Sequence, residues 1–363
     1  MTALAGLFNA GKAAVQLNVG PLVAPLTRTQ FRSPDKYSYP RPPRLQSHND
    51  QQSVWMSSSP EGATVGWGGR FADLAMSSNG NPLFSSVAIP GRSVFLVGNR
   101  AVGYQIGSDG AVALDGINGP KARFFYGSTN TANTVNTLIR QSRSHMLENE
   151  YNRVTARSLD AYEQVRGTLD AAPITTVFPA GSLGAQLKTV ARLIGGRNVS
   201  GAKRQVFFVS IGGFDHHDNL MGLHPGLMAT VSDAMAAFYN ATVELGVADK
   251  VTAFTASEFG RTLSSNGNGS DHGWGSHHLV VGGGVKGAAF YGTAPPVSVG
   301  NTDAPEDQWH IGGGVLLPST SVHQYSATLA RWFGVADTEM DGVLPNLKNF
   351  NSAAYPRYLG FLG

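Results

Sequence analysis

The stretch "RQVFFVSIGGFDHHDN" at residues 204–219 decides the fold prediction, because an apolar run leads directly into a polar cluster. Its first half, 204–211, is of the kind found in strands that are buried on both faces. The next segment, "PGLMATVSDAMAAFYNATVELG" at 225–246, carries one apolar stripe and predicts a helix, and "KVTAFTA" at 250–256 predicts a second strand. Together they form a β-α-β unit, which predicts an α/β fold with a mostly parallel sheet.

Outward from this unit, apolar runs predict further strands at 13–19, 93–98, 101–107 and 278–285. Helical spacing predicts one or two helices within 131–168, and single helices at 183–196 and 321–334, the last stopped by Gly334. The proline- and arginine-rich stretch 33–44 suits a long surface loop. We therefore expect a single domain over residues 1–363 with a loop-rich insertion at about 33–130.

Composition excludes several classes of protein. The net charge of +3 is spread thinly, with no cluster of lysine and arginine, so the chain lacks the footprint of a nucleic-acid-binding protein. No apolar run approaches the roughly 18 residues that span a bilayer. The absence of cysteine excludes disulfides, thiolate metal sites and a cysteine nucleophile. The compartment and the oligomeric state stay open.

Three loops that follow predicted strands carry most of the ionisable side chains. Ligands of parallel α/β sheets bind just beyond the carboxyl ends of the strands, so these loops are expected to converge. Six of the ten histidines lie between 216 and 278. The loop residues of interest are Asp215, His216, His217, Asp218, Ser257, Glu258, Arg261, Asp271, His272, His277 and His278.

Carboxylate oxygen and imidazole nitrogen are ligands for zinc, manganese or iron. Three such loops could hold one or two divalent ions, and Arg261 could bind a phosphate or sulfate as a fork. Taken singly, each residue also has a structural interpretation: a hydrogen-bonded histidine, Asp271 capping a turn, or Arg261 pairing with Glu258. The coincidence of three loops favours metal binding.

Several motifs in fixed order resemble the DUF1501 family of the alkaline phosphatase-like superfamily. They are "GGFDHHDN", "SEFGRT", "SDHGWGSHHLVVGGGVKGAAFYG" and "LLPSTSVHQYSATLARWFGV", preceded by "GKAAVQLNVGPLVAPLTRTQF", "QSHNDQQSVW" and "GWGGRFADL". The resemblance implies a three-layer α/β/α sandwich around a mostly parallel sheet, with one or two metal ions.

The resemblance also implies roles for individual residues. Asp215 and His217 look like ligands of one ion, completed by a histidine of "DHGWGSHH", and Glu258 stands where a carboxylate of the second ion is expected. His216 replaces a residue that is more often threonine in the family, so His217 is the better ligand. The predicted metal set is Asp215, His217, Glu258, Asp271, His272 and His278, and the predicted catalytic residues are Ser47, as nucleophile, and Arg261. A turn serine is the alternative interpretation of Ser47.

Family members usually begin with an apolar strand and a "GGND"-like turn, which this sequence does not contain before "LAGLFNAGKAAV". We therefore expect either a chain truncated at its N-terminus or a natural short form that lacks one aspartate ligand and a central strand, and in both cases the missing segment would have carried the export signal. The family resemblance implies twin-arginine export and a periplasmic or secreted protein.

Two functions follow from these observations. The first is a metal-dependent hydrolase of phosphate or sulfate esters that uses zinc or manganese and acts on a small-molecule or polymer substrate. The second is a non-catalytic, metal-stabilised binding or assembly protein of the same fold.

Overall fold

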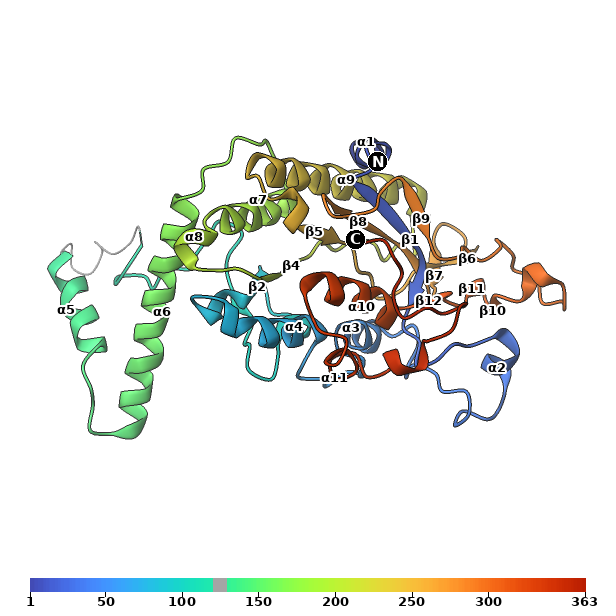
Figure 1. The fold of residues 1–363 in the computed structure, drawn as a ribbon, viewed down its shortest axis with the longest axis horizontal. Helices are drawn as coiled ribbons and strands as arrows, with labels where there is room; N and C mark the ends of the chain where they lie inside the picture. The colour runs from blue at the N-terminus through green and yellow to red at the C-terminus, as the bar shows by residue number, and fades with distance from the viewer. Residues whose placement is uncertain (120–128) are drawn as a thin grey trace.

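The computed structural model describes residues 1–119 and 129–363, and it is an α/β fold in which helices cover both faces of the strands (Figure 1). One sheet has the order β12-β1-β8-β5 with β9 beside β1, and a second has the order β3-β2-β4. Two smaller pairs are β6-β7 and β10-β11. The strands are β1 Ala13–Gly20, β2 Ser86–Ile89, β3 Tyr104–Gln105, β4 Val206–Val209, β5 Thr252–Phe254, β6 Arg261–Ser265, β7 Ser270–His272, β8 Ser276–Gly282, β9 Ala289–Tyr291, β10 His310–Gly312, β11 Val315–Leu316 and β12 Thr320–Ser321.

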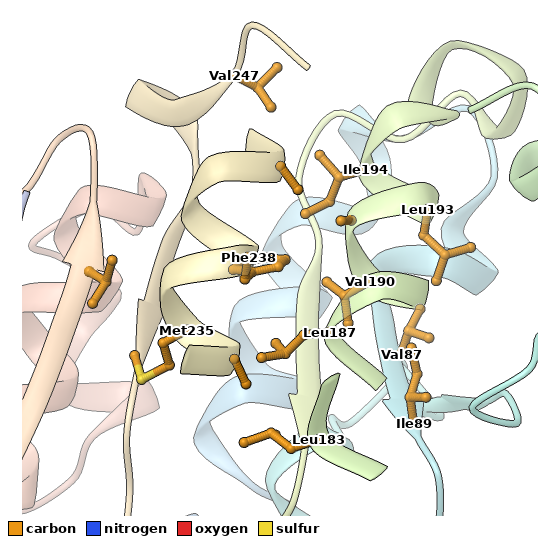
Figure 2. Packing of buried hydrophobic residues seen from close by; sticks show 14 of the residues in the cluster. Val87, Ile89, Leu183, Leu187, Val190, Leu193, Ile194, Met235, Phe238 and Val247 are labelled. Carbon is orange, nitrogen blue, oxygen red and sulfur yellow. The ribbon is translucent and has the colours of Figure 1, made fainter. Parts of the chain in front are cut away.

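Two apolar layers hold the helices to the strands. On one face, α1, α7 and α9 pack through residues such as Leu187, Met235 and Phe238 (Figure 2). On the other face, α3, α4 and α10 pack through Trp55, Trp67 and Tyr325. The α-helices are α1 Thr2–Asn9, α2 Arg28–Arg32, α3 His48–Ser57, α4 Trp67–Ala75, α5 Thr129–Ile139, α6 Met146–Asp170, α7 Ser182–Gly195, α8 Arg197–Ser200, α9 Leu220–Glu244, α10 Val322–Phe333 and α11 Met340–Val343.

The strands form mixed sheets, so the prediction of a mostly parallel sheet is wrong. Strand β2 is parallel to β3 and β4, and β1 is parallel to β9 and β12, but β8 runs antiparallel to both β1 and β5. Parallel neighbours need a long crossover, usually a helix. The connection from β5 to β8 has no helix and carries only the β6-β7 hairpin, so the chain returns beside β5 in the opposite direction.

Most of the predicted elements are confirmed. The strands at 13–19, 204–211, 250–256 and 278–285 correspond to β1, β4, β5 and β8, and the helix at 321–334 is α10, whose C-cap Gly334 has a φ of 100°. The strand prediction for 93–98 is wrong, because Val94–Leu96 forms a 3-10 helix. Within the region 33–130, α3 and α4 contribute buried residues to the core, and β2 lies between β3 and β4.

The hairpin of α5 and α6 extends away from the rest of the molecule (Figure 1). Leu147, Tyr151 and Val154 on α6 are exposed. In the described part of the chain, no helix combines the length and the apolar character needed to cross a bilayer.

Candidate metal centre

Four segments bring the polar side chains together at the ends of β4 and β5. The loop after β4 supplies Asp215 and His217, and the loop after β5 supplies Glu258. The β6-β7 hairpin supplies Arg261 at its start and His272 at its end, and the two residues pair across the hairpin. The fourth segment is the first turn of α3, where His48 follows the N-cap Ser47.

The Asp215 carboxylate lies at the centre of this group. His48 Nε2 is 3.2 Å from Asp215 Oδ2, and the Nε2 atoms of His272 and His217 are 3.0 and 3.1 Å from Oδ1. Arg261 Nη1 donates to the same Oδ1 at 2.6 Å. Three imidazoles therefore present the same ring atom to one carboxylate.

The opposite ring nitrogen of each imidazole contacts an oxygen that can only accept a hydrogen bond. His48 Nδ1 is 3.0 Å from Glu258 Oε1, and His217 Nδ1 is 3.2 Å from Asp271 Oδ1. His272 Nδ1 is 2.8 Å from the carbonyl oxygen of Gln46. Each Nε2 faces the Asp215 carboxylate, which also only accepts, so the single proton of a neutral imidazole can serve only one of its two contacts.

The Nε2 atoms and the Asp215 carboxylate therefore bring several lone pairs close together, with too few protons to form a hydrogen bond at each contact. His217 Nε2 and His272 Nε2 lie only 2.9 Å apart, and both face Asp215 Oδ1. A bound cation or protonation of the rings would relieve this repulsion. One ligand atom from each of His48, Asp215 and His272 lies within 4.8 Å of the others, so these three residues could hold a metal ion.

The electrostatics of the site keep both of its aspartates charged. Burial alone would raise the pKa of Asp215, but the hydrogen bond from Arg261 and the neighbouring His217 and His272 outweigh it and lower the pKa to about 2. The pKa of Asp271 is lowered mainly by the amide of Asn266 and then by His217. Both groups are thus carboxylates, the form that a metal site requires.

A sequence profile described as "Protein of unknown function (DUF1501)" matches residues 5–345 of the chain. The chain belongs to the DUF1501 family. No curated protein and no solved structure matched it.

In this DUF1501 protein, the predicted site residues fall into two groups. Asp215, His217, Glu258, Asp271, His272 and Arg261 form one connected network, with Glu258 and Asp271 each hydrogen-bonded to a histidine Nδ1. His278 lies elsewhere, inside β8, where Ser276 and Thr255 contact its two nitrogens. Its pKa is lowered to about 3, mainly by burial and then by His277.

The two predicted catalytic residues of this DUF1501 protein are both engaged by neighbouring groups. Ser47 Oγ donates to Asp50 Oδ2 at 2.9 Å. Arg261 uses Nη1 on Asp215 and Nη2 on the carbonyl of Ser270, and its side chain is 16% exposed. Arg261 thus positions Asp215 and ties the β6-β7 hairpin to the loop after β4.

His216 lies apart from the network and is buried, with its ring 5.7 Å from that of His224. His48 is the ligand candidate that sequence reasoning missed. It lies 167 residues before Asp215 and does not follow a predicted strand, so the strand-end argument passed over it. Its signal was the polar run "QSHNDQQ", in which His48 directly follows the predicted nucleophile Ser47.

Proposed function

We propose that this DUF1501 protein is a metal-dependent hydrolase of phosphate or sulfate esters, of the alkaline phosphatase-like kind. The observation that supports it is the orientation of three imidazoles by acceptors at Nδ1, which turns every Nε2 toward the Asp215 carboxylate. Histidines oriented by an outer carboxylate or carbonyl are typical of metal ligands.

His48, Asp215 and His272 would hold the ion, with His217 beside them. Glu258, Asp271 and the Gln46 carbonyl would orient the imidazoles. A mixed set of nitrogen and oxygen donors without thiolate suits zinc or manganese. When bound, such an ion polarises an ester oxygen and lowers the pKa of a bound water.

Ser47 is the proposed nucleophile, because it directly precedes His48 at the N-terminus of α3. Asp50 Oδ2 already accepts the proton of its hydroxyl, which is the arrangement that attack by Ser47 Oγ would require. Arg261 would keep Asp215 charged and in place.

One observation favours the alternative, a metal-stabilised binding or assembly protein. Both terminal nitrogens of Arg261 are occupied by Asp215 and Ser270, so they do not stand free to bind the equatorial oxygens of a substrate. In that case the ion would join the loops after β4 and β5 to the β6-β7 hairpin and α3, and would contribute stability rather than catalysis.

The test measures metal content and turnover on the same sample. The purified chain is analysed for zinc and manganese, then assayed with aryl phosphate and aryl sulfate esters after either metal is added. Bound metal with turnover that a chelator abolishes supports the hydrolase. Bound metal without turnover on any ester supports the assembly protein, and failure to bind either metal overturns both proposals.

A further inference from the structure

Helix α6 carries one stripe of side chains along its length, and only the second half of this stripe is covered. The stripe follows the alternating spacing of four and three residues that is typical of coiled coils, and it consists of Leu147, Tyr151, Val154, Ser158, Ala161, Val165 and Thr168. The last three are buried where α6 contacts α7 and α8. The first four are exposed, although three of them are large and apolar. An apolar surface that continues out of the core in this way is typical of an interface.

Helix α5 packs on a different face of α6 and leaves this half of the stripe open. The side-chain amide of Asn152 donates to the carbonyl oxygens of Leu138 and Gln141, and Arg140 pairs with Asp160. With 3.6 residues per turn, Asn152 and Asp160 lie on the side of α6 opposite the stripe. The exposed half therefore belongs to the part of the hairpin that extends away from the body of the molecule (Figure 1).

The charged residues beside the stripe indicate what covers it. Glu150 and Arg157 flank the stripe on the same side, and their side chains are 50% and 67% exposed. In an antiparallel pair of identical helices centred between Tyr151 and Val154, Glu150 of each copy lies opposite Arg157 of the other. In a parallel pair, Glu150 would instead lie opposite the uncharged Thr155. The surface is thus complementary to itself in one orientation.

We propose that the chain forms a two-fold symmetric dimer through antiparallel pairing of the first halves of α6. Tyr151 of each copy packs against Val154 of the other, Leu147 packs beside Ser158, and two pairs of Glu150 with Arg157 join the copies. Since only about three turns of each helix are covered, we expect a dissociation constant on the order of 1–100 µM.

The proposal does not depend on the proposed hydrolase function. Figure 1 places the α5-α6 hairpin at the opposite end of the molecule from β6 and β7, which carry Arg261 and His272. Its tests measure association of the chain and require neither metal nor turnover.

The first test removes apolar surface without adding charge. Sedimentation equilibrium of the purified chain, from about 1 to about 200 µM, should show a monomer and a dimer in equilibrium. Leu147→Gln with Tyr151→Gln should weaken the dimer by about 30-fold or more and keep the helix, since glutamine is a good helix former. Met221→Gln, at an 81% exposed position on α9, is the matched control. A monomer across the whole range, or equal effects of the two variants, would overturn the proposal.

A charge exchange tests the pairing across the interface. Glu150→Arg alone and Arg157→Glu alone should each weaken the dimer by about tenfold, because like charges then face each other. An equal mixture of the two variants should regain the wild-type affinity as a heterodimer. Arg153→Glu makes the same change in charge at a residue that also pairs with Glu150 within the chain but lies away from the stripe, so it should have little effect. Wild-type affinity of both single variants would overturn the antiparallel pairing.

Cross-linking tests the orientation independently. The chain contains no cysteine, so introduced thiols report on the interface alone. An equal mixture of Leu147→Cys and Ser158→Cys, oxidised with diamide, should form a disulfide-linked dimer. Leu147→Cys alone should not, because antiparallel pairing separates the two copies of this residue by about 16 Å along the helix axis, which is too far for a disulfide. Efficient cross-linking of Leu147→Cys with itself would show a parallel dimer and overturn the proposal.

Discussion

Two groups of histidines in this protein differ in the atoms that surround them. His48, His217 and His272 each have an acceptor-only oxygen at Nδ1 and a carboxylate in front of Nε2. The buried pair, His278 and His323, has serine or threonine hydroxyls at both nitrogens.

This difference distinguishes a histidine suited to bind a metal ion from a structural histidine. A hydroxyl can donate or accept, so it satisfies either ring nitrogen and leaves no lone pair exposed. An oxygen that only accepts needs a proton from the ring, so a neutral imidazole between two such oxygens lacks one proton, and a cation can take the lone pair that remains. The number of histidines in a segment carries less information than the chemistry of their partners.

The largest expected effect is at the centre of the first group. Asp215→Asn keeps the size of the side chain but removes the charge that faces three imidazoles, so metal affinity should fall by more than about 100-fold and any turnover should be lost. Isothermal titration with zinc measures the affinity. Asp218→Asn is the matched control in the same loop, and a similar loss in both variants would show that Asp215 has no special role.

A paired substitution tests the contrast between the groups directly. His272→Gln should lower zinc affinity by about 100-fold or more with little change in the stability of the chain measured without metal. His278→Gln should do the reverse, because it disturbs a buried side chain packed against Trp55 and Tyr325, at a cost of about 1–3 kcal/mol. Denaturant unfolding with and without zinc measures both effects, and the opposite pattern would refute the distinction.

Acid should lower the stability of the fold, because the buried histidines bind protons more readily in the unfolded chain. Burial lowers the pKa of His323 to about 4, whereas the unfolded side chain titrates near 6.5. Between these values the unfolded chain binds more protons, so the stability falls as the pH drops from about 6.5 toward 4, by up to about 1.4 kcal/mol per pH unit for this group.

Denaturant unfolding at several pH values, with a chelator present, tests this effect. His323→Asn should flatten the dependence, and His145→Asn, at an exposed position, should leave it unchanged. If stability changed with pH to the same extent in the wild type and in His323→Asn, His323 would not be the cause of the pH dependence.

The smallest expected effect concerns Asp271, which lies at the edge of the network around Asp215. Asp271 contacts His217 Nδ1 rather than the central carboxylate, so Asp271→Asn should weaken zinc binding by only about tenfold. Asn266→Ala, which removes the amide that also bonds Asp271, should have a weaker effect in the same titration. A loss as large as that of Asp215→Asn would instead make Asp271 a direct ligand.

Much of the fold could be predicted because apolar periodicity reports burial. The apolar runs located β1, β4, β5 and β8, and the stripe ending at Gly334 located α10. The same runs could not give strand direction, because a buried strand has the same composition whether its neighbour is parallel or antiparallel. The reversal of β8 depends on a connection without a helix, which only the structure displays.

The site could be predicted only where its residues directly follow a predicted strand. Asp215 and Glu258 each follow a strand of the predicted β-α-β unit, so they could be grouped from their positions, although β4 and β5 belong to different sheets in the structure. His48 reaches the group from a helix, and His278 leaves it because alternate residues of a strand point to opposite faces and this one points into the core. The polar run "QSHNDQQ" marks His48 as a polar position, but local sequence does not tell which loops that helix meets or that His278 faces the core.

Strand β1 has one further consequence, for the order in which the chain can fold during synthesis. Its partners β8, β9 and β12 follow it by about 260 to 300 residues. At typical translation rates the ribosome needs on the order of 15–60 s to make that length, so β1 emerges long before anything can pair with it. Its apolar residues Val15, Leu17 and Val19 are exposed to the cell during that interval, and we expect production of this chain to depend on chaperones that hold such segments.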